Sequence, residues 1–235
     1  MNNNYLYEIE LWICGLTVLS IGFYLYYHLK SNFNINMKLE LTNNIVSVLV
    51  QTYFSLSCFY NLVYSSTLTF DLYNIMLGYF IYDIIFLIFF NKNVVDTSIL
   101  TIHHITCFFC ILYGKEYIEF SYDIIYYSLI VFSTMESLNM LRNTLSIMKI
   151  LECKIGYRLT LFSLFIFLYP FVRGIILIYC VYTCSYILPY YQSIIVNCFL
   201  IPVNLISIFG FYIAIKSWKE IKVLYDNSLD KNSDL

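Results

Sequence analysis

Seven long apolar runs divide this chain of 235 residues, and they constrain its fold more than any other feature. A helix needs roughly 20 apolar residues to cross the hydrocarbon core of a bilayer. The runs therefore predict an all-α fold, a polytopic transmembrane helical bundle of about seven spans, with six as the alternative. The predicted spans are Leu11–Tyr27, Ile45–Tyr64, Tyr73–Phe90, Ser98–Tyr113, Tyr122–Leu141, Leu159–Tyr182 and Ser193–Ile215.

The composition agrees with a membrane environment. Hydrophobic residues make up 60% of the chain and charged residues only 12%, whereas soluble domains carry about 25% charged residues. A water-soluble domain of this size could not hide so much apolar surface. The net charge of −2, with few and scattered basic residues, gives no electrostatic footprint for a nucleic-acid partner. The eight cysteines fall mostly inside apolar runs and lack the spacing of a disulfide framework.

Basic residues in the connections predict the orientation. With seven spans and the N-terminus outside, ten lysines and arginines fall on the cytosolic side, leaving out Lys231 in the tail, and only Lys115 falls on the other. This asymmetry follows the positive-inside rule, and a six-span arrangement places basic connections on both sides. The ten residues are Lys30, Lys38, Lys92, Arg142, Lys149, Lys154, Arg158, Lys216, Lys219 and Lys222.

The same reasoning predicts four segments along the chain. Residues 1–10 form a non-cytosolic N-terminal segment, and residues 11–44 form the first span and a cytosolic loop. Residues 45–222 form the main transmembrane bundle, and residues 223–235 form a short polar cytosolic tail, disordered after Tyr225. No soluble domain is expected between the spans.

A few polar side chains lie inside the predicted spans. Such groups are expensive in a bilayer and by default indicate a functional site. Antiparallel packing of the third, fourth and fifth spans brings the carboxylates and histidines to a similar depth, in one pocket open towards the cytosol. The candidate pocket or lipid-binding residues are Asp83, His103, His104, Glu136, Asn139, Arg173 and Asn204.

The chemistry of this pocket follows from pairing a carboxylate with an imidazole, which fixes the tautomer of the ring and produces a base or proton relay. Adjacent helical residues point about 100° apart, so only one of His103 and His104 is expected to face the pocket. The alternative is that all these groups are structural ties between helices. In that reading Arg173 neutralises Asp83 or Glu136, and Asn204 binds carbonyl groups freed by Pro202.

Metal binding is a further alternative for the fourth span. His103, Cys107 and Cys110 fall at i, i+4 and i+7 on one helical face, a spacing that could supply zinc ligands. Structural zinc sites usually close four ligands, however, and cysteine is an ordinary small residue in membrane helices. No metal is therefore expected.

Four segments together resemble the TLC-domain family, which includes ceramide synthases and the translocating-chain-associated membrane protein. The resemblance covers the chain from about Ile45 to Lys222. Its most specific part is a Gly-Tyr-x-x-x-Asp motif followed by a His-His pair. The segments are Gly78-Tyr79-Phe80-Ile81-Tyr82-Asp83, His103-His104, Ser133-Thr134-Met135-Glu136-Ser137-Leu138-Asn139-Met140-Leu141-Arg142 and Phe171-Val172-Arg173.

The resemblance implies a multi-pass protein of an endoplasmic-reticulum-like membrane that handles or senses lipids. In the synthases the His-His pair looks catalytic, a role that would fall on His103 and His104. The synthases have a His-Asp-x-Ser-Asp stretch where this chain reads Ser133-Thr134-Met135-Glu136-Ser137. The chain is therefore more similar to the non-synthase branch of the family.

Three functions follow as hypotheses. The first is binding, sensing or regulation of membrane lipids, with a sphingolipid, fatty-acyl chain or phospholipid as the partner and no cofactor. The second is an acyl-CoA-dependent N-acyltransferase in which a histidine is the base and acyl-CoA is a substrate. The third is a transport or protein-translocation accessory that uses the polar groups as a gate. The sequence leaves the oligomeric state open.

Overall fold

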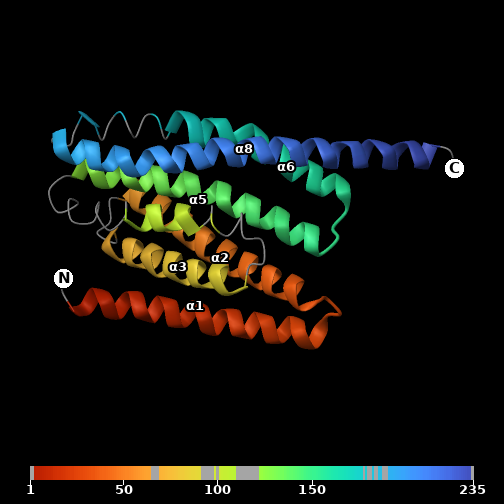
Figure 1. Ribbon diagram of the computed structural model, residues 1–235, viewed down its shortest axis with the longest axis horizontal. Helices are drawn as coiled ribbons and strands as arrows, with labels where there is room; N and C mark the ends of the chain where they lie inside the picture. Colours follow the sequence, from red (N-terminus) through yellow and green to blue (C-terminus); the bar gives the residue numbers. More distant parts are fainter. Residues whose placement is uncertain are drawn as a thin grey trace.

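Helix is the only regular structure in the part of the chain that the computed structural model describes, residues 3–64, 69–90, 98, 101–109, 122–176, 178, 182, 185–186 and 190–233 (Figure 1). The prediction of an all-α fold is confirmed. Residues 101–109, which carry His103 and His104, are helical. The seven other helices are α1 (Asn3–Lys30), α2 (Ile35–Tyr64), α3 (Thr69–Phe90), α5 (Tyr122–Ile150), α6 (Ile155–Tyr169), the π-helix η1 (Pro170–Ile176) and α8 (Tyr190–Ser233).

Three stretches of the described residues are helical, long and apolar enough to cross a membrane. They are Glu8–Lys30, Leu72–Phe90 and Ile155–Ile175, which overlap the first, third and sixth predicted spans. Large apolar side chains on these helices face outwards: Val18 is 69% exposed, Phe89 74% and Phe167 65%. Lipid solvates such surfaces and water does not, so the chain has the character of an integral membrane protein.

Several helices continue past the ends of the apolar runs. The predicted cytosolic loop is short, because α2 already begins at Ile35. The side chain of Asn34 accepts a hydrogen bond from the backbone N–H of Met37 at 2.9 Å and so caps the first turn of α2. The predicted disordered tail is also wrong over most of its length, since α8 extends to Ser233. An apolar run therefore marks the part of a helix that can lie in lipid and does not mark where the helix ends, since α8 continues to Ser233 through mostly polar residues.

A turn of four residues joins α5 to α6. Glu152 has a φ of 51°, in the left-handed region that often ends a helix. The N–H of Cys153 bonds to the carbonyl oxygen of Met148 at 3.0 Å, and the N–H of Glu152 bonds to that of Lys149 at 3.2 Å. This hydrogen-bond pair is a Schellman motif. It turns the chain back sharply, so that α6 runs antiparallel to α5 (Figure 1).

The change from α-helix to π-helix occurs at a proline. α6 ends at Tyr169, and η1 begins at Pro170. Proline lacks the backbone N–H, and its ring collides with the carbonyl group one turn earlier. A wider turn accommodates the ring without ending the helix, as at other π-bulges. The wider turn carries Arg173.

The helices lie side by side along the long axis, with α1 on one side, α2 and α3 next to it, α5 beyond them, and α6 with α8 on the far side (Figure 1). Contacts follow this order, since α1 packs against α2 and α3, α2 packs against α5, and α6 packs against α5 and α8. α1 and α3 approach closely at Gly78, where an added Cβ would lie only 2.8 Å from the Cβ of Trp12. The buried core lies mainly on α2 and α3.

Candidate functional site

The carboxylate of Asp83 on α3 lies against His104, one of the two histidines predicted to belong to the site. Oδ2 of Asp83 lies 3.0 Å from Nδ1 of His104, and both side chains are buried, 7% and 12% exposed. The contact has the length of an ion pair, although it lacks the alignment of a hydrogen bond. The ring of Phe80 packs against the imidazole, with centroids 5.3 Å apart. The predicted proximity of an aspartate and an imidazole is therefore present.

A hydrogen-bonded chain reaches the same carboxylate from two further helices. Nδ2 of Asn43 on α2 donates to Oδ1 of Asp83 at 3.0 Å. The hydroxyl of Tyr82 donates to Oδ1 of Asn43 at 3.3 Å, and Ser20 on α1 is hydrogen-bonded to the same tyrosine hydroxyl. The chain thus links α1, α3 and α2 to Asp83.

Proton counting gives this chain a direction. Ser20 and Tyr82 each carry one hydroxyl proton. If Tyr82 donates to Asn43, then Ser20 must donate to Tyr82 for that short contact to be a hydrogen bond. Every donor then points towards Asp83, and aligned hydrogen bonds of this kind strengthen one another. The alternative, in which Ser20 donates to the carbonyl of Leu16 at 2.8 Å, leaves Asn43 without the tyrosine proton.

The second histidine has different neighbours. Both ring nitrogens of His103 lie near Sγ of Cys107, Nδ1 at 3.9 Å and Nε2 at 3.8 Å. Its ring centroid is 5.5 Å from that of His104. The two imidazoles thus differ as the helical offset predicts: His104 contacts Asp83, and His103 lies along its own helix against a thiol.

Three other predicted residues, Glu136, Asn139 and Arg173, contact one another in turn between α5 and η1. Nη2 of Arg173 donates to Oδ1 of Asn139 at 2.9 Å, and Nδ2 of Asn139 lies 3.3 Å from each oxygen of Glu136. Glu136 is 5% exposed and Arg173 8%. The amide therefore bridges the two charges, and Arg173 does not neutralise Glu136 through a direct ion pair among the described residues.

The two groups of side chains share one electrostatic environment. Glu136 interacts electrostatically with Arg173, with His104 and with Asp83. Within the described part of the chain, Nε and Nη1 of Arg173 are buried without a hydrogen-bond partner. Buried polar groups normally have partners, so these two N–H groups are available to a polar ligand. We name Asp83, His104, Glu136, Asn139 and Arg173 the polar cluster.

Sequence reasoning missed the amides that hold the helices together. Nδ2 of Asn143 on α5 donates to Oε1 of Gln51 on α2 at 3.0 Å, and Nε2 of Gln51 donates to the hydroxyl of Tyr79 on α3 at 3.4 Å. Gln51 lies in the middle of a predicted span, which is a signal that could have identified it. Asn43 gave no such signal, because it precedes the apolar run.

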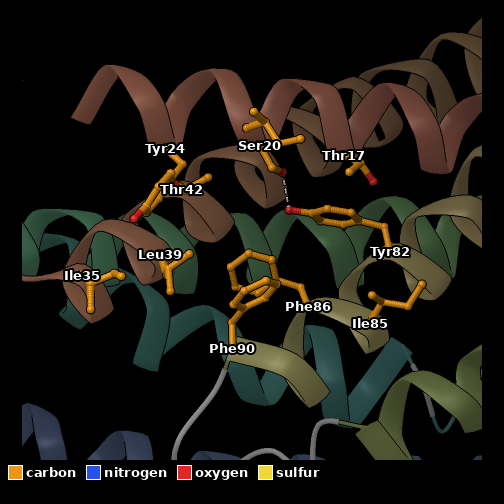
Figure 2. A pocket seen from close by; sticks show the side chains of 11 residues that line it. Thr17, Ser20, Tyr24, Ile35, Leu39, Thr42, Tyr82, Ile85, Phe86 and Phe90 are labelled. Atoms are coloured by element: carbon orange, nitrogen blue, oxygen red, sulfur yellow. Dashed lines mark hydrogen bonds between the residues drawn. The ribbon is translucent and has the colours of Figure 1, made fainter. Parts of the chain in front are cut away.

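The cavity that the structure describes lies elsewhere. It has a volume of about 460 Å³ and lies between α1, α2 and α3 (Figure 2). None of the predicted site residues lines it. Its lining residues are Thr17, Ser20, Ile21, Tyr24, Ile35, Leu39, Thr42, Tyr82, Ile85, Phe86 and Phe90. Ser20 and Tyr82 belong both to this lining and to the hydrogen-bonded chain that ends at Asp83.

Two predictions fall partly outside the described residues. The backbone of Asn204 lies in α8, but its side chain is not among those described. Cys110, the third residue of the possible zinc stripe, also lies outside them. Within the described part of the chain, no three His, Cys, Asp or Glu side chains group closely enough to hold a metal ion.

Comparisons with known proteins do not extend the resemblance found in the motifs. The chain matches no family model, and no curated protein or solved structure is similar to it. The resemblance to the TLC-domain family thus rests on the four sequence segments alone, and the function must be argued from the geometry of the site.

Proposed function

We propose that this chain is a multi-pass membrane protein of TLC type that binds or senses membrane lipids through the polar cluster. The contact between Asp83 and His104 carries the proposal. Two titratable side chains from separate helices meet there. One of these helices, α3, which carries Asp83, is long and apolar enough to cross the bilayer. Ionisable groups at membrane depth are costly and rare, and they commonly mark functional sites.

The placement of the helix ends supports a specific orientation. α1, α3 and α5 end, and α2 and α6 begin, at the same end of the bundle (Figure 1). Most of the basic connecting residues belong to this end, among them Lys30, Arg142 and Lys154. By the positive-inside rule it faces the cytosol. We therefore propose seven spans in an endoplasmic-reticulum-like membrane, with the N-terminus outside and the C-terminus in the cytosol.

The donors and acceptors of the polar cluster define the ligand chemistry. Asp83 and Glu136 offer carboxylate oxygens, and Arg173 offers two N–H groups without partners among the described residues. Amide, ester and phosphate groups of lipids all accept hydrogen bonds from such N–H groups. The proposed ligand is a sphingolipid, fatty-acyl lipid or phospholipid whose polar linkage lies against Arg173 while its chains remain in the apolar surroundings.

Native mass spectrometry of the purified chain tests this function. We expect a co-purified polar lipid that is lost, at unchanged folding, in Asp83→Asn and in His104→Ala. Matched controls are Asp226→Asn and His28→Ala, which remove the same groups at exposed positions and should retain the lipid. Equal lipid content in all four variants would rule out the polar cluster as the binding site.

One observation also favours an acyltransferase as a second candidate. Nδ1 of His104 lies 3.0 Å from Asp83, so Nε2 is the nitrogen left to take a proton from an amine or hydroxyl, and a small rotation of the ring would align Nδ1–H with the carboxylate as in a general base. Acyl-CoA would be the acyl donor. Purified protein would then consume acyl-CoA when given a long-chain base, and His104→Ala would lose more activity than His103→Ala. No acyl-CoA consumption would exclude this candidate.

A further inference from the structure

The cavity between α1, α2 and α3 has a polar inner part and an apolar outer part. Ser20 and Tyr82 lie further along the helices from Ile35 than Tyr24 does, and Thr42 lies between Tyr24 and Ser20 (Figure 2). The rings of Phe86 and Phe90, with centroids 5.0 Å apart and planes tilted by 41°, form part of the outer wall. The volume of about 460 Å³ lies within the roughly 300–1,000 Å³ of small-molecule sites.

One hydroxyl in the inner part lacks the partner that comparable hydroxyls have. Thr52, Thr106 and Thr144 each donate to the carbonyl oxygen four residues earlier, at 2.7 to 2.8 Å, the usual way in which a helical hydroxyl is satisfied. Thr42 is 1% exposed, and within the described residues its Oγ1 has no hydrogen-bond partner. It lines the cavity, so a bound molecule can supply that partner.

A second hydroxyl offers only an acceptor to the cavity. In either arrangement the proton of Ser20 is used within the protein, on the carbonyl oxygen of Leu16 at 2.8 Å or on the hydroxyl of Tyr82. At least one lone pair of Ser20 therefore remains for a ligand, whatever the state of Asp83. Together Thr42 and Ser20 can donate one hydrogen bond and accept one, which matches a single hydroxyl group.

The surroundings exclude a charged ligand group. No Lys, Arg, Asp or Glu is among the lining residues, and an unpaired charge inside a bilayer costs about 3 kcal/mol or more. A carboxylate only accepts hydrogen bonds and so could not use the lone pairs of Ser20. A hydroxyl group at the end of an apolar chain carries no charge, and it can both accept a hydrogen bond from Thr42 and donate one to Ser20.

We propose that this cavity binds an uncharged long-chain alcohol, with its hydroxyl group inwards between Thr42 and Ser20 and its apolar chain against the aromatic outer wall. This binding site is separate from the polar cluster, and it rests on the membrane placement proposed above but not on lipid binding by Asp83 or His104.

Photo-crosslinking with the full chain in lipid nanodiscs tests the site, using hexadecanol that carries a diazirine group as the probe. We expect saturable labelling of lining residues on α1, α2 and α3. Hexadecanol should compete with the probe, whereas palmitate and hexadecane should compete at least tenfold less well. Equal competition by hexadecane would show a purely apolar site, and stronger competition by palmitate would show an acid-binding site. Either result, or labelling spread evenly over the lipid-facing surface, would overturn the proposal.

Two variants locate the binding site. Thr42→Val, which is nearly isosteric, should weaken the probe roughly 3- to 10-fold, the effect of one neutral hydrogen bond. Leu39→Trp should abolish labelling by filling the cavity, whereas Leu49→Trp, at a 47% exposed position on the same helix, should not. If a variant does not fold, the competition experiment on the unaltered chain still decides.

The two proposals can fail separately. Asp83→Asn should release the polar lipid of the proposed function while alcohol labelling persists. Thr42→Val should weaken alcohol labelling while the polar lipid stays bound. Loss of both ligands in both variants would show that there is one site and not two.

Discussion

α3 and the helix formed by α6 and η1 are both long and apolar enough to cross a membrane, yet they have opposite surroundings. In Leu72–Phe90, 67% of the most apolar stretch is buried inside the protein, against 6% in Ile155–Ile175. α3 lies against α1 and α2, whereas α6 contacts α5 and α8 and leaves much of its surface outwards. Apolarity predicts that a helix enters the bilayer, but it does not tell whether the helix meets lipid or protein.

Polar residues separate α3 from α6 better than apolar ones do, whereas η1 at the end of α6 carries the buried Arg173. α3 buries Asn74 and Asp83, whereas α6 carries Thr160 and Ser163, whose exposed hydroxyls donate to their own helix backbone. A charge facing lipid would be very costly, so a carboxylate in an apolar run indicates a helix with protein around it. Hydroxyl groups that satisfy themselves locally impose no such requirement.

The largest expected effect comes from the close approach of α3 to α1. Gly78→Leu places atoms where Trp12 and the backbone of Ile9 already lie, and we expect a loss of about 3 kcal/mol in the free energy of unfolding. Gly174→Ala, where an added Cβ meets nothing within 4 Å, should leave that free energy unchanged or raise it by up to about 1 kcal/mol. Unfolding in mixed micelles measures both. Equal effects would contradict the contrast between the two helices.

A smaller effect is expected from truncating apolar side chains. Leu77 on α3 is 1% exposed and Leu164 on α6 is 45% exposed. Leu77→Ala leaves a cavity and should lower the free energy of unfolding by about 2 kcal/mol. This value is at the low end of the range for soluble protein cores, because the side chain is transferred from lipid and not from water when the helices associate. Leu164→Ala exchanges protein–lipid contact for lipid–lipid contact and should cost less than about 0.5 kcal/mol. A difference below about 1 kcal/mol between the variants would show that α3 is not packed as described.

The smallest effect concerns the coupling between Asp83 and His104. A double-mutant cycle with Asp83→Asn and His104→Ala should give a coupling energy of about 0.6 kcal/mol, which is no more than the average for hydrogen bonds between membrane helices, because this close contact is not aligned as a hydrogen bond. The exposed hydrogen bond from Trp218 to Ser163 on α6, at 2.9 Å, provides the comparison through Trp218→Phe and Ser163→Ala. A larger coupling there than at Asp83 would reverse the ranking of the two regions.

Much of the fold and part of the candidate site follow from the sequence. The apolar runs predict helices, and the cost of burying charge predicts that Asp83 and a histidine face protein. Side-chain partners do not follow, because they depend on the rotation of each helix. Arg173 illustrates this point: its charge predicted a carboxylate partner, but its position in the wider turn after Pro170 brings it to the amide of Asn139.

The cavity could not be predicted from sequence for a related reason. Nothing in the sequence marks Thr17 and Ser20, which lie inside the first apolar run, or Thr42, which precedes the second, as residues of one site. Only the arrangement of three helices places their hydroxyl groups around one cavity. Neither hydropathy nor spacing along one helix carries that information, since the cavity depends on how far apart the helix axes lie.

The length of α8 has a mechanical consequence. Its 44 residues, at about 1.5 Å each, form a rod of about 66 Å, more than twice the thickness of the hydrocarbon layer, about 30 Å. Its C-terminal part extends past the other helices (Figure 1). Because a rod transmits tilt, any reorientation of this helix among its neighbours is magnified at its C-terminal end.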